Sequence, residues 1–168
     1  MQCMNFIFLR RSWADDEAYL KRTFAYSRRI AKSDPGRTMV LLFPEGTDLS
    51  PSQLQKTNDF GAKSNKAARQ YTLHPRTTGF SHFVRGLGDA IDSIVDITMG
   101  YVDYAEGERP NEKSLLSGRM PREVHVCIKR HALSELALDD ASLREWCTAR
   151  FEEKEVNLAA FYAARAAA

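Results

Sequence analysis

The segment Leu42–Asp48 contains side chains whose types and spacing could do chemistry. A continuous apolar run ends there in Pro-Glu-Gly-Thr. Pro44 cannot donate to a strand ladder, Glu45 offers a carboxylate, and Gly46 allows a bound group to approach the backbone closely. Ligands bind at the carboxyl ends of strands in open α/β sheets, so the pattern predicts a binding turn. The same residues are equally typical of an ordinary surface turn.

Two other segments contain arginine or histidine in a distinctive setting. Leu73–Phe80 has the sequence Leu-His-Pro-Arg-Thr-Thr-Gly-Phe, and Phe6–Arg11 ends in two adjacent arginines. His74 could act as a general base, but a histidine before proline is more typical of a structural, hydrogen-bonded group. Considered alone, the paired arginines are typical of a solvated surface.

The first half of the chain has the patterning of strands that alternate with helices. Continuous apolar runs predict buried strands, while Ser, Pro and Asp signals predict helix starts. The predicted order is a strand at 6–9, a helix at 13–32, a strand at 38–43, a helix from 51 towards 70 and a brief strand at 71–73. This order contains a strand-helix-strand unit.

The second half predicts two helices and two alternating strands. Phe80, Phe83, Val84 and Leu87 have helical spacing, which predicts a helix that Gly86 weakens. The remaining predicted segments are half-buried strands at 95–101 and 124–128, a loop-rich stretch at 105–121, a final helix from 142 and a tail from 159 to 168. The fold class expected is α/β, with a mixed, largely parallel sheet flanked by helices.

Composition excludes several classes of protein. With 168 residues, 24 basic and 22 acidic, the chain can form one ordinary domain and lacks the strong positive charge typical of a nucleic-acid binder. The three cysteines have no metal-binding spacing and favour a reducing compartment. No apolar run approaches the roughly 20 residues that span a bilayer, and no signal peptide is predicted. The charged run 152–155 is typical of a solvated helix surface.

Five segments resemble, in order, blocks of the glycerophospholipid acyltransferase family, which includes the 1-acylglycerol-3-phosphate and lysophospholipid acyltransferases. They are Phe6–Arg11, Phe43–Thr47, Leu73–Phe80, Met120–His125 and Trp146–Glu155. The first two resemble the F-I-x-R and F-P-E-G-T blocks, with Arg11 as the matching arginine. The form of the third block, together with Asp48, is similar to the lysocardiolipin and lysophosphatidylinositol acyltransferase branch.

This resemblance implies a function, partners and a set of substrate-binding residues. The expected reaction is acyl transfer from acyl-CoA, as co-substrate and without a cofactor, to the glycerol hydroxyl of a lysophospholipid. The implied acceptor-binding residues are Arg11, Glu45, Gly46, Thr47, Pro75 and Arg76. The resemblance also implies an acyltransferase domain over 1–102, an associated C-terminal region over 103–168, a membrane surface as partner and location at the endoplasmic reticulum.

The family's catalytic H-x-x-x-x-D block does not occur in this sequence. In the family, the histidine acts as general base on the acceptor hydroxyl and the aspartate orients the imidazole. Here the residues five positions after the four histidines are Gly79, Leu87, Arg130 and Leu136. We therefore expect an N-terminally truncated acyltransferase domain that is inactive alone. The alternatives are a non-catalytic lipid- or CoA-binding relative and, less favoured by the charge balance, a nucleic-acid-binding module.

Overall fold

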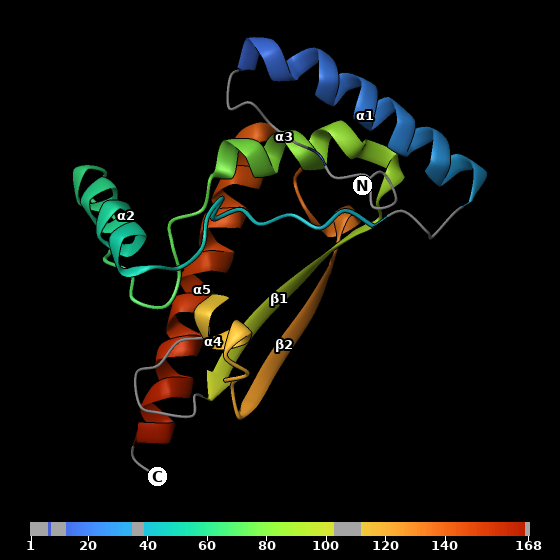
Figure 1. The fold of residues 1–168 in the computed structure, drawn as a ribbon. Helices are drawn as coiled ribbons and strands as arrows, with labels where there is room; N and C mark the ends of the chain where they lie inside the picture. The colour runs from blue at the N-terminus through green and yellow to red at the C-terminus, as the bar shows by residue number, and fades with distance from the viewer. Residues whose placement is uncertain (1–6, 8–12, 35–38, 103–111, 167–168) are drawn as a thin grey trace.

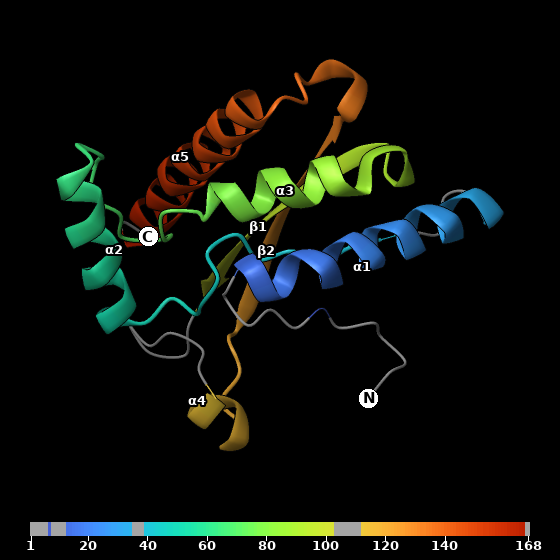
Figure 2. The same cartoon turned by 90° about the horizontal axis from the view of Figure 1, so that it is seen from above.

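The computed structural model describes residues 7, 13–34, 39–102 and 112–166, and the fold is described for these residues. The elements along the chain are α1 (Trp13–Ser33), α2 (Pro51–Lys63), α3 (Thr77–Leu87), η1 (Gly88–Ala90), β1 (Ser93–Val102), α4 (Glu112–Leu116), β2 (Glu123–Ala132), η2 (Leu133–Glu135) and α5 (Asp140–Ala166). In Figures 1 and 2, α3 lies between α1 and α5, and α5 runs beside the two strands.

The interface between α1 and α3 forms one of two buried apolar clusters. Leu20 and Phe24, one helical turn apart on α1, pack against Phe83 and Leu87 of α3. Close approach is possible because Gly86 has no side chain: a Cβ there would lie 2.3 Å from the Phe24 ring. The predicted helices at 13–32 and 80–87 are confirmed, and Gly86 serves their packing.

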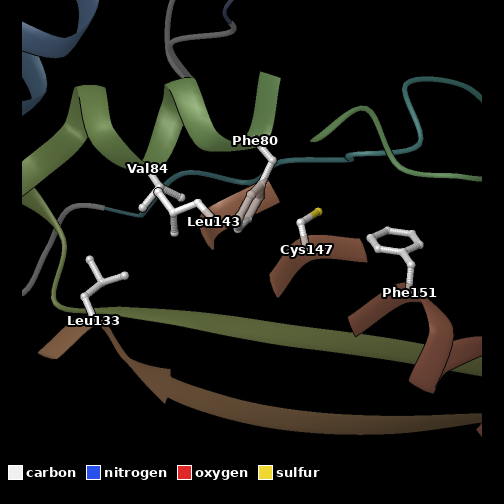
Figure 3. Close-up of a cluster of buried hydrophobic side chains, with 6 residues drawn as sticks. All are labelled: Phe80, Val84, Leu133, Leu143, Cys147 and Phe151. Atoms are coloured by element: carbon white, nitrogen blue, oxygen red, sulfur yellow. The ribbon is translucent and has the colours of Figure 1, made fainter. Parts of the chain in front are cut away.

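The second cluster joins α3 to α5 and to the end of the hairpin. Figure 3 shows Phe80 and Val84 pointing from α3 towards Leu143, with Cys147 and Phe151 following along α5. Leu143 is fully buried, and Cys147 is 2% exposed. Helix α5 begins after Asp139, whose carboxylate accepts the Ser142 N–H at 3.0 Å. The predicted final helix is confirmed, but it continues to Ala166 where a tail was expected.

The sheet corrects the predicted fold class. Within the described part of the chain it has two strands, β1 and β2, which pair antiparallel with Ile97 opposite Ile128. The prediction of a largely parallel sheet is therefore wrong for these residues. Both strands lie where the alternation placed them. Their direction was not predictable in the same way, because a period of two specifies a strand but not the direction of its partner.

Polar side chains lie on the covered face of this sheet. Asp96 and Thr98 of β1 contact Lys154 of α5, and a Cβ at Gly100 would touch the Phe161 ring of α5. The apolar residues on the opposite face are 45–63% exposed: Val95, Ile97, Met99, Val124, Val126 and Ile128. The apolar side of these half-buried strands was expected to be the buried one, and the structure reverses that assignment.

Two shorter predicted strands are not strands. Residues 39–43 are extended without a ladder partner; Val40 and Leu42 contact the clusters, whereas Leu41 is 72% exposed. Residues 71 and 72 form bends and Leu73 has no regular structure; the amides of all three bond to side chains. The predicted strand at 6–9 lies outside the described residues apart from Ile7, which has no strand assignment.

Helix α2 begins at the predicted Pro51 but ends earlier than expected. Asn65 has a left-handed φ of 52°, and the Lys66 N–H donates to the Gly61 carbonyl at 2.9 Å. This is the 6→1 bond of a Schellman motif, which stops the helix after Lys63. The remaining residues to Gln70 lead back towards the start of α3 as an irregular segment.

Candidate functional site

The Pro-Glu-Gly-Thr segment forms a tight turn between the extended residues 39–43 and α2. The Gly46 N–H donates to the Phe43 carbonyl at 3.0 Å, and Gly46 has a φ of +72°. This left-handed conformation favours glycine, because a Cβ would crowd the backbone. The Thr47 hydroxyl donates to the Asp48 carboxylate at 2.9 Å. The turn therefore exposes its backbone at Gly46 while its neighbouring hydroxyl is engaged locally.

Glu45 ties this turn to the second predicted segment. Its Oε1 accepts the Leu73 N–H at 2.7 Å, and the residue is half-buried. Burial raises the pKa of the Glu45 carboxyl above its ordinary value, while the Leu73 hydrogen bond acts in the opposite direction. One carboxylate oxygen is thus occupied by the protein's own backbone.

Arg76 lies directly over the turn. Its backbone N–H donates to the Pro44 carbonyl at 2.7 Å. A Cβ built on Gly46 would lie 2.8 Å from Arg76 Nε and 3.0 Å from Cδ, so the arginine side chain covers the glycine. Pro75, half-buried, accepts the Thr77 N–H through its carbonyl at 3.1 Å, and α3 begins at Thr77. The two segments therefore meet at Gly46 and Arg76.

The Arg76 guanidinium is available for an anion. Arg76 is exposed, and none of the ion pairs between described residues involves it. The structure thus brings together Glu45, Gly46, Thr47, Pro75 and Arg76. Arg11, the sixth predicted substrate-binding residue, lies outside the described residues. The planar guanidinium of an exposed arginine can bind a phosphate or carboxylate.

His74 is packed against α2, away from solvent. It is 8% exposed, and a Cβ at Gly61 would lie 2.4 Å from its Nε2. Its backbone N–H donates to the Thr57 hydroxyl at 3.0 Å, but neither ring nitrogen has a hydrogen-bond partner among the described residues. Burial, together with the Arg69 charge, lowers the pKa of His74. A neutral, enclosed imidazole without an acid partner favours the packing role over that of a replacement base.

The described residues also include a buried thiol, that of Cys147, and side chains that could bind a metal ion. Burial raises the pKa of the Cys147 thiol to about 12, so it is not a thiolate near neutral pH. No three His, Cys, Asp or Glu side chains within the described ranges are placed to hold a metal ion. Among the described residues of the predicted site, the exposed Arg76 guanidinium is the group that could pair with an anion.

Comparison with known proteins identifies the family. Residues 114–166 match the family model described as the acyltransferase C-terminus. Lysocardiolipin acyltransferase 1 of Danio rerio is 38% identical over 164 residues, which cover 96% of this chain and 40% of the relative. The protein of the same name from Mus musculus is 38% identical over 164 residues, covering 96% and 42%. Lysophosphatidylinositol acyltransferase 10 of Caenorhabditis elegans is 33% identical over 165 residues, covering 96% and 40%.

The chain belongs to the glycerophospholipid acyltransferase family, in its lysocardiolipin and lysophosphatidylinositol acyltransferase-like branch. The resemblance of its sequence blocks is thereby confirmed at the level of family and branch. The chain spans about two fifths of the length of these relatives. No solved structure gives a significant match. None of the helices in the described ranges is long and apolar enough to cross a bilayer.

Two charged residues of the family's C-terminal region, the buried Lys154 and the partly exposed Glu155, have bonding partners that the sequence interpretation missed. Lys154 is 8% exposed, and its Nζ donates to the Ile97 carbonyl at 2.7 Å and lies 2.5 Å from the Asp96 carboxylate. Glu155 binds backbone amides ahead of His74. The assignment of 152–155 to a solvated surface is wrong for both residues. The available signal was the position of Lys154 within the apolar stripe of α5, because a cation placed there requires acceptors.

Proposed function

We propose that this chain is the acceptor-binding part of an acyl-CoA-dependent lysophospholipid acyltransferase, and that the Pro44–Thr47 turn and Arg76 bind the phosphate of the acceptor. The observation that carries the proposal is the exposed Arg76 side chain, which packs over Gly46 in the Pro44–Thr47 turn. Planar guanidinium donors can pair with two phosphate oxygens at once. The absence of a Cβ at Gly46 lets the Arg76 side chain pack directly against the turn.

Within this proposal the chemistry is direct transfer without a covalent acyl-enzyme. A histidine from an H-x-x-x-x-D block takes the proton of the glycerol hydroxyl, whose oxygen attacks the thioester carbon of acyl-CoA, and the CoA thiol leaves. The four histidines of this sequence do not supply the block. We therefore expect the chain alone to bind an acceptor but not to turn it over.

The binding step is tested by calorimetric titration with lysophosphatidate and with monoacylglycerol, which lacks the phosphate. The purified chain is expected to bind lysophosphatidate more tightly. Arg76→Gln should abolish that difference, because it removes the charged donors. Arg122→Gln is the matched control, since Arg122 is also an exposed arginine but belongs to a segment far from the turn and from Arg76 in the sequence. Equal binding of the two lipids by the wild-type chain would contradict the proposal.

The catalytic step is tested by transfer of labelled oleoyl from oleoyl-CoA to lysophosphatidate, lysophosphatidylinositol and lysocardiolipin. We compare this chain with a chimaera that carries a relative's H-x-x-x-x-D segment ahead of residue 1. Activity is expected in the chimaera only, with loss on Arg76→Gln. Turnover by the chain alone would overturn the expected inactivity.

A second candidate is a non-catalytic lipid- or CoA-binding relative, in which the exposed Arg76 would pair with the anionic ligand without turnover. In that case the chain would bind lysophosphatidate or CoA, while the chimaera would remain silent with all three acceptors. The same two assays therefore separate the candidates.

A membrane surface, for example that of the endoplasmic reticulum, is part of the proposal because the acceptor is a lipid. Helix α1 exposes Arg22, Arg28 and Arg29, which fit anionic headgroups electrostatically. Co-sedimentation with phosphatidylcholine vesicles, with and without phosphatidylglycerol, tests this surface. The expected result is binding to the anionic vesicles that Arg28→Glu with Arg29→Glu weakens; unchanged binding would exclude α1 as the contact.

A further inference from the structure

Glu155 of α5 holds the segment that leads into the candidate site. Its Oε1 accepts the N–H groups of Gln70 at 2.6 Å and Tyr71 at 3.1 Å. Its Oε2 accepts from the Tyr71 N–H at 3.2 Å, the Thr72 N–H at 2.9 Å and the Thr72 hydroxyl at 2.8 Å. Three successive amides thus converge on one carboxylate, as they do around an anion bound in a backbone nest.

The residue before this nest is also fixed by α5. The buried Arg69 donates through Nη1 to the Phe151 carbonyl at 2.6 Å, one helical turn ahead of Glu155. The side chain of Asn58 donates to the Arg69 carbonyl at 2.9 Å and accepts the Arg69 N–H at 2.8 Å. Helix α5 therefore holds the segment at two points, and α2 holds it at a third.

The hydrogen bonds continue without a gap into the turn that contains Arg76. After Thr72, the Leu73 N–H donates to Glu45, the His74 N–H to Thr57 and the Arg76 N–H to the Pro44 carbonyl. Pro75 has no N–H to donate. Every amide N–H from Arg69 to Arg76 thus has an acceptor, and six of these seven bonds use a side-chain acceptor. The path of this segment depends on side chains, since it has no strand partner.

We propose that Glu155 is a positioning residue for the acceptor-phosphate site: it sets the path of residues 70–73 and thereby the position of Arg76 over Gly46. The role of Arg76 in this inference rests on the proposed function. Among the described residues, no hydrogen bond joins Glu155 to the turn; burial and, after it, the Glu155 charge raise the pKa of the Glu45 carboxyl, and the hydrogen bonds of Glu155 act through the backbone of residues 70–72. It links the C-terminal region that defines the family match, residues 114–166, to the site in the first half of the chain.

The chemistry requires a carboxylate at this position. Five donor contacts converge on its two oxygens, so both oxygens must be acceptors. In Glu155→Gln one oxygen becomes an NH₂ group, whose hydrogens would face amide hydrogens. Partly buried N–H groups would then lose their partners, and the segment would have to move to regain them.

The test uses the ¹⁵N-labelled chain and compares Glu155→Gln with Glu152→Gln. Glu152 is an exposed glutamate on the same helix. In the ligand-free protein, Glu155→Gln is expected to speed amide exchange at 70–72 and to shift the Gly46 N–H and Arg76 Nε–H resonances, whereas Glu152→Gln leaves them unchanged. Unchanged Gly46 and Arg76 resonances in a folded Glu155→Gln protein would overturn the proposal.

Titration with glycerol 3-phosphate, followed at the same two resonances, separates this inference from the proposed function. Glu155→Gln is expected to weaken binding on the order of tenfold, the scale at which supporting hydrogen-bonded groups tune a site. Wild-type affinity in that variant would overturn the inference. Absence of binding in the wild-type chain would instead refute the phosphate site, while the ligand-free resonances still decide the positioning role. Should Glu155→Gln fail to fold, Thr72→Val replaces it as the test, because it removes a single hydroxyl donor to Glu155. This variant is expected to shift the Gly46 and Arg76 resonances by less than the loss of the carboxylate would. Unchanged resonances in Thr72→Val would refute the inference.

Discussion

Gly86 provides the sharpest test of how the helices pack. A Cβ at this position would lie 2.3 Å from Phe24 Cε2 and 2.4 Å from Cδ2. The Phe24 ring is 3% exposed and meets the Phe83 ring edge-on at 5.3 Å, so it has little room to move. Gly86→Ala therefore forces α1 away from α3 or drives the ring from its rotamer.

Two opposing effects determine the size of the change. Replacing a helical glycine with alanine ordinarily contributes about 0.5–1 kcal/mol, because glycine loses more conformational freedom on folding. Inserting a methyl group into a packed core costs about 1–3 kcal/mol. With the clash directed at a buried ring, we expect Gly86→Ala to lower the free energy of unfolding by about 1–2 kcal/mol.

Gly79 is the matched control, because it lies in the same helix and its Cβ would meet no heavy atom within 4 Å. Gly79→Ala should raise stability by up to about 1 kcal/mol. Urea unfolding followed by circular dichroism at a helical wavelength measures both changes. Equal stabilisation by the two substitutions would refute the close packing of Phe24 on Gly86.

Three further substitutions test the ion pair, the turn and the buried histidine. Lys154→Met is expected to lower the free energy of unfolding by about 3–5 kcal/mol, because it leaves Asp96 without its cation; adding Asp96→Asn should recover most of this loss in urea unfolding, and no recovery would exclude the charge as the cause. Gly46→Ala should cost about 1–2 kcal/mol, because φ is +72°; it should also move the Arg76 Nε–H resonance, and an unchanged spectrum would contradict the contact. Burial lowers the pKa of His74 below its ordinary 6.5, so its contribution to stability is present above pH 6.5 and is lost as the pH falls through the lowered pKa. His74→Gln should therefore reduce the difference in urea midpoint between pH 8 and pH 5, and an undiminished difference would show that His74 does not titrate in this way.

The helices were predictable from the sequence, because local hydrophobic periodicity and capping residues determine where they form. The start of α2 at Pro51 and the hydrophobic spacing of α1 and α3 needed no knowledge of distant residues. The strand predicted at the apolar run 39–43 is wrong, because the composition of such a run is the same whether or not a second strand pairs with it. In the structure, contacts of Val40 and Leu42 with the helical clusters explain the run without a ladder.

The candidate site was predictable as two segments but not as one geometry. The Pro-Glu-Gly-Thr turn and the Leu-His-Pro-Arg segment were identified by residue type, and the need for Gly46 follows from its left-handed φ. That Arg76 covers Gly46 could not be derived from spacing, since 30 positions in the sequence separate the two residues and the chain between them is partly irregular. The Glu45–Leu73 hydrogen bond is what closes this loop.

The brief strand predicted at 71–73 failed for a different reason, which links the fold to the proposed role of α5. Backbone amides that are shielded from water require acceptors, and the sequence interpretation supplied a neighbouring strand for them. The structure supplies Glu155 for Tyr71 and Thr72, 84 and 83 residues further along the chain, and Glu45 for Leu73. A side-chain acceptor on a helix leaves no periodic pattern in the sequence. The available signal was the charged Lys154 within the apolar stripe of α5, which indicated that this face of the helix has polar partners. Since Glu155 and Lys154 are adjacent, one turn of α5 fixes both the segment ahead of Arg76 and the central part of β1. A change at Glu155 should therefore disturb the segment ahead of Arg76, whereas a change at Lys154 should disturb β1 and the neighbouring core at Cys147.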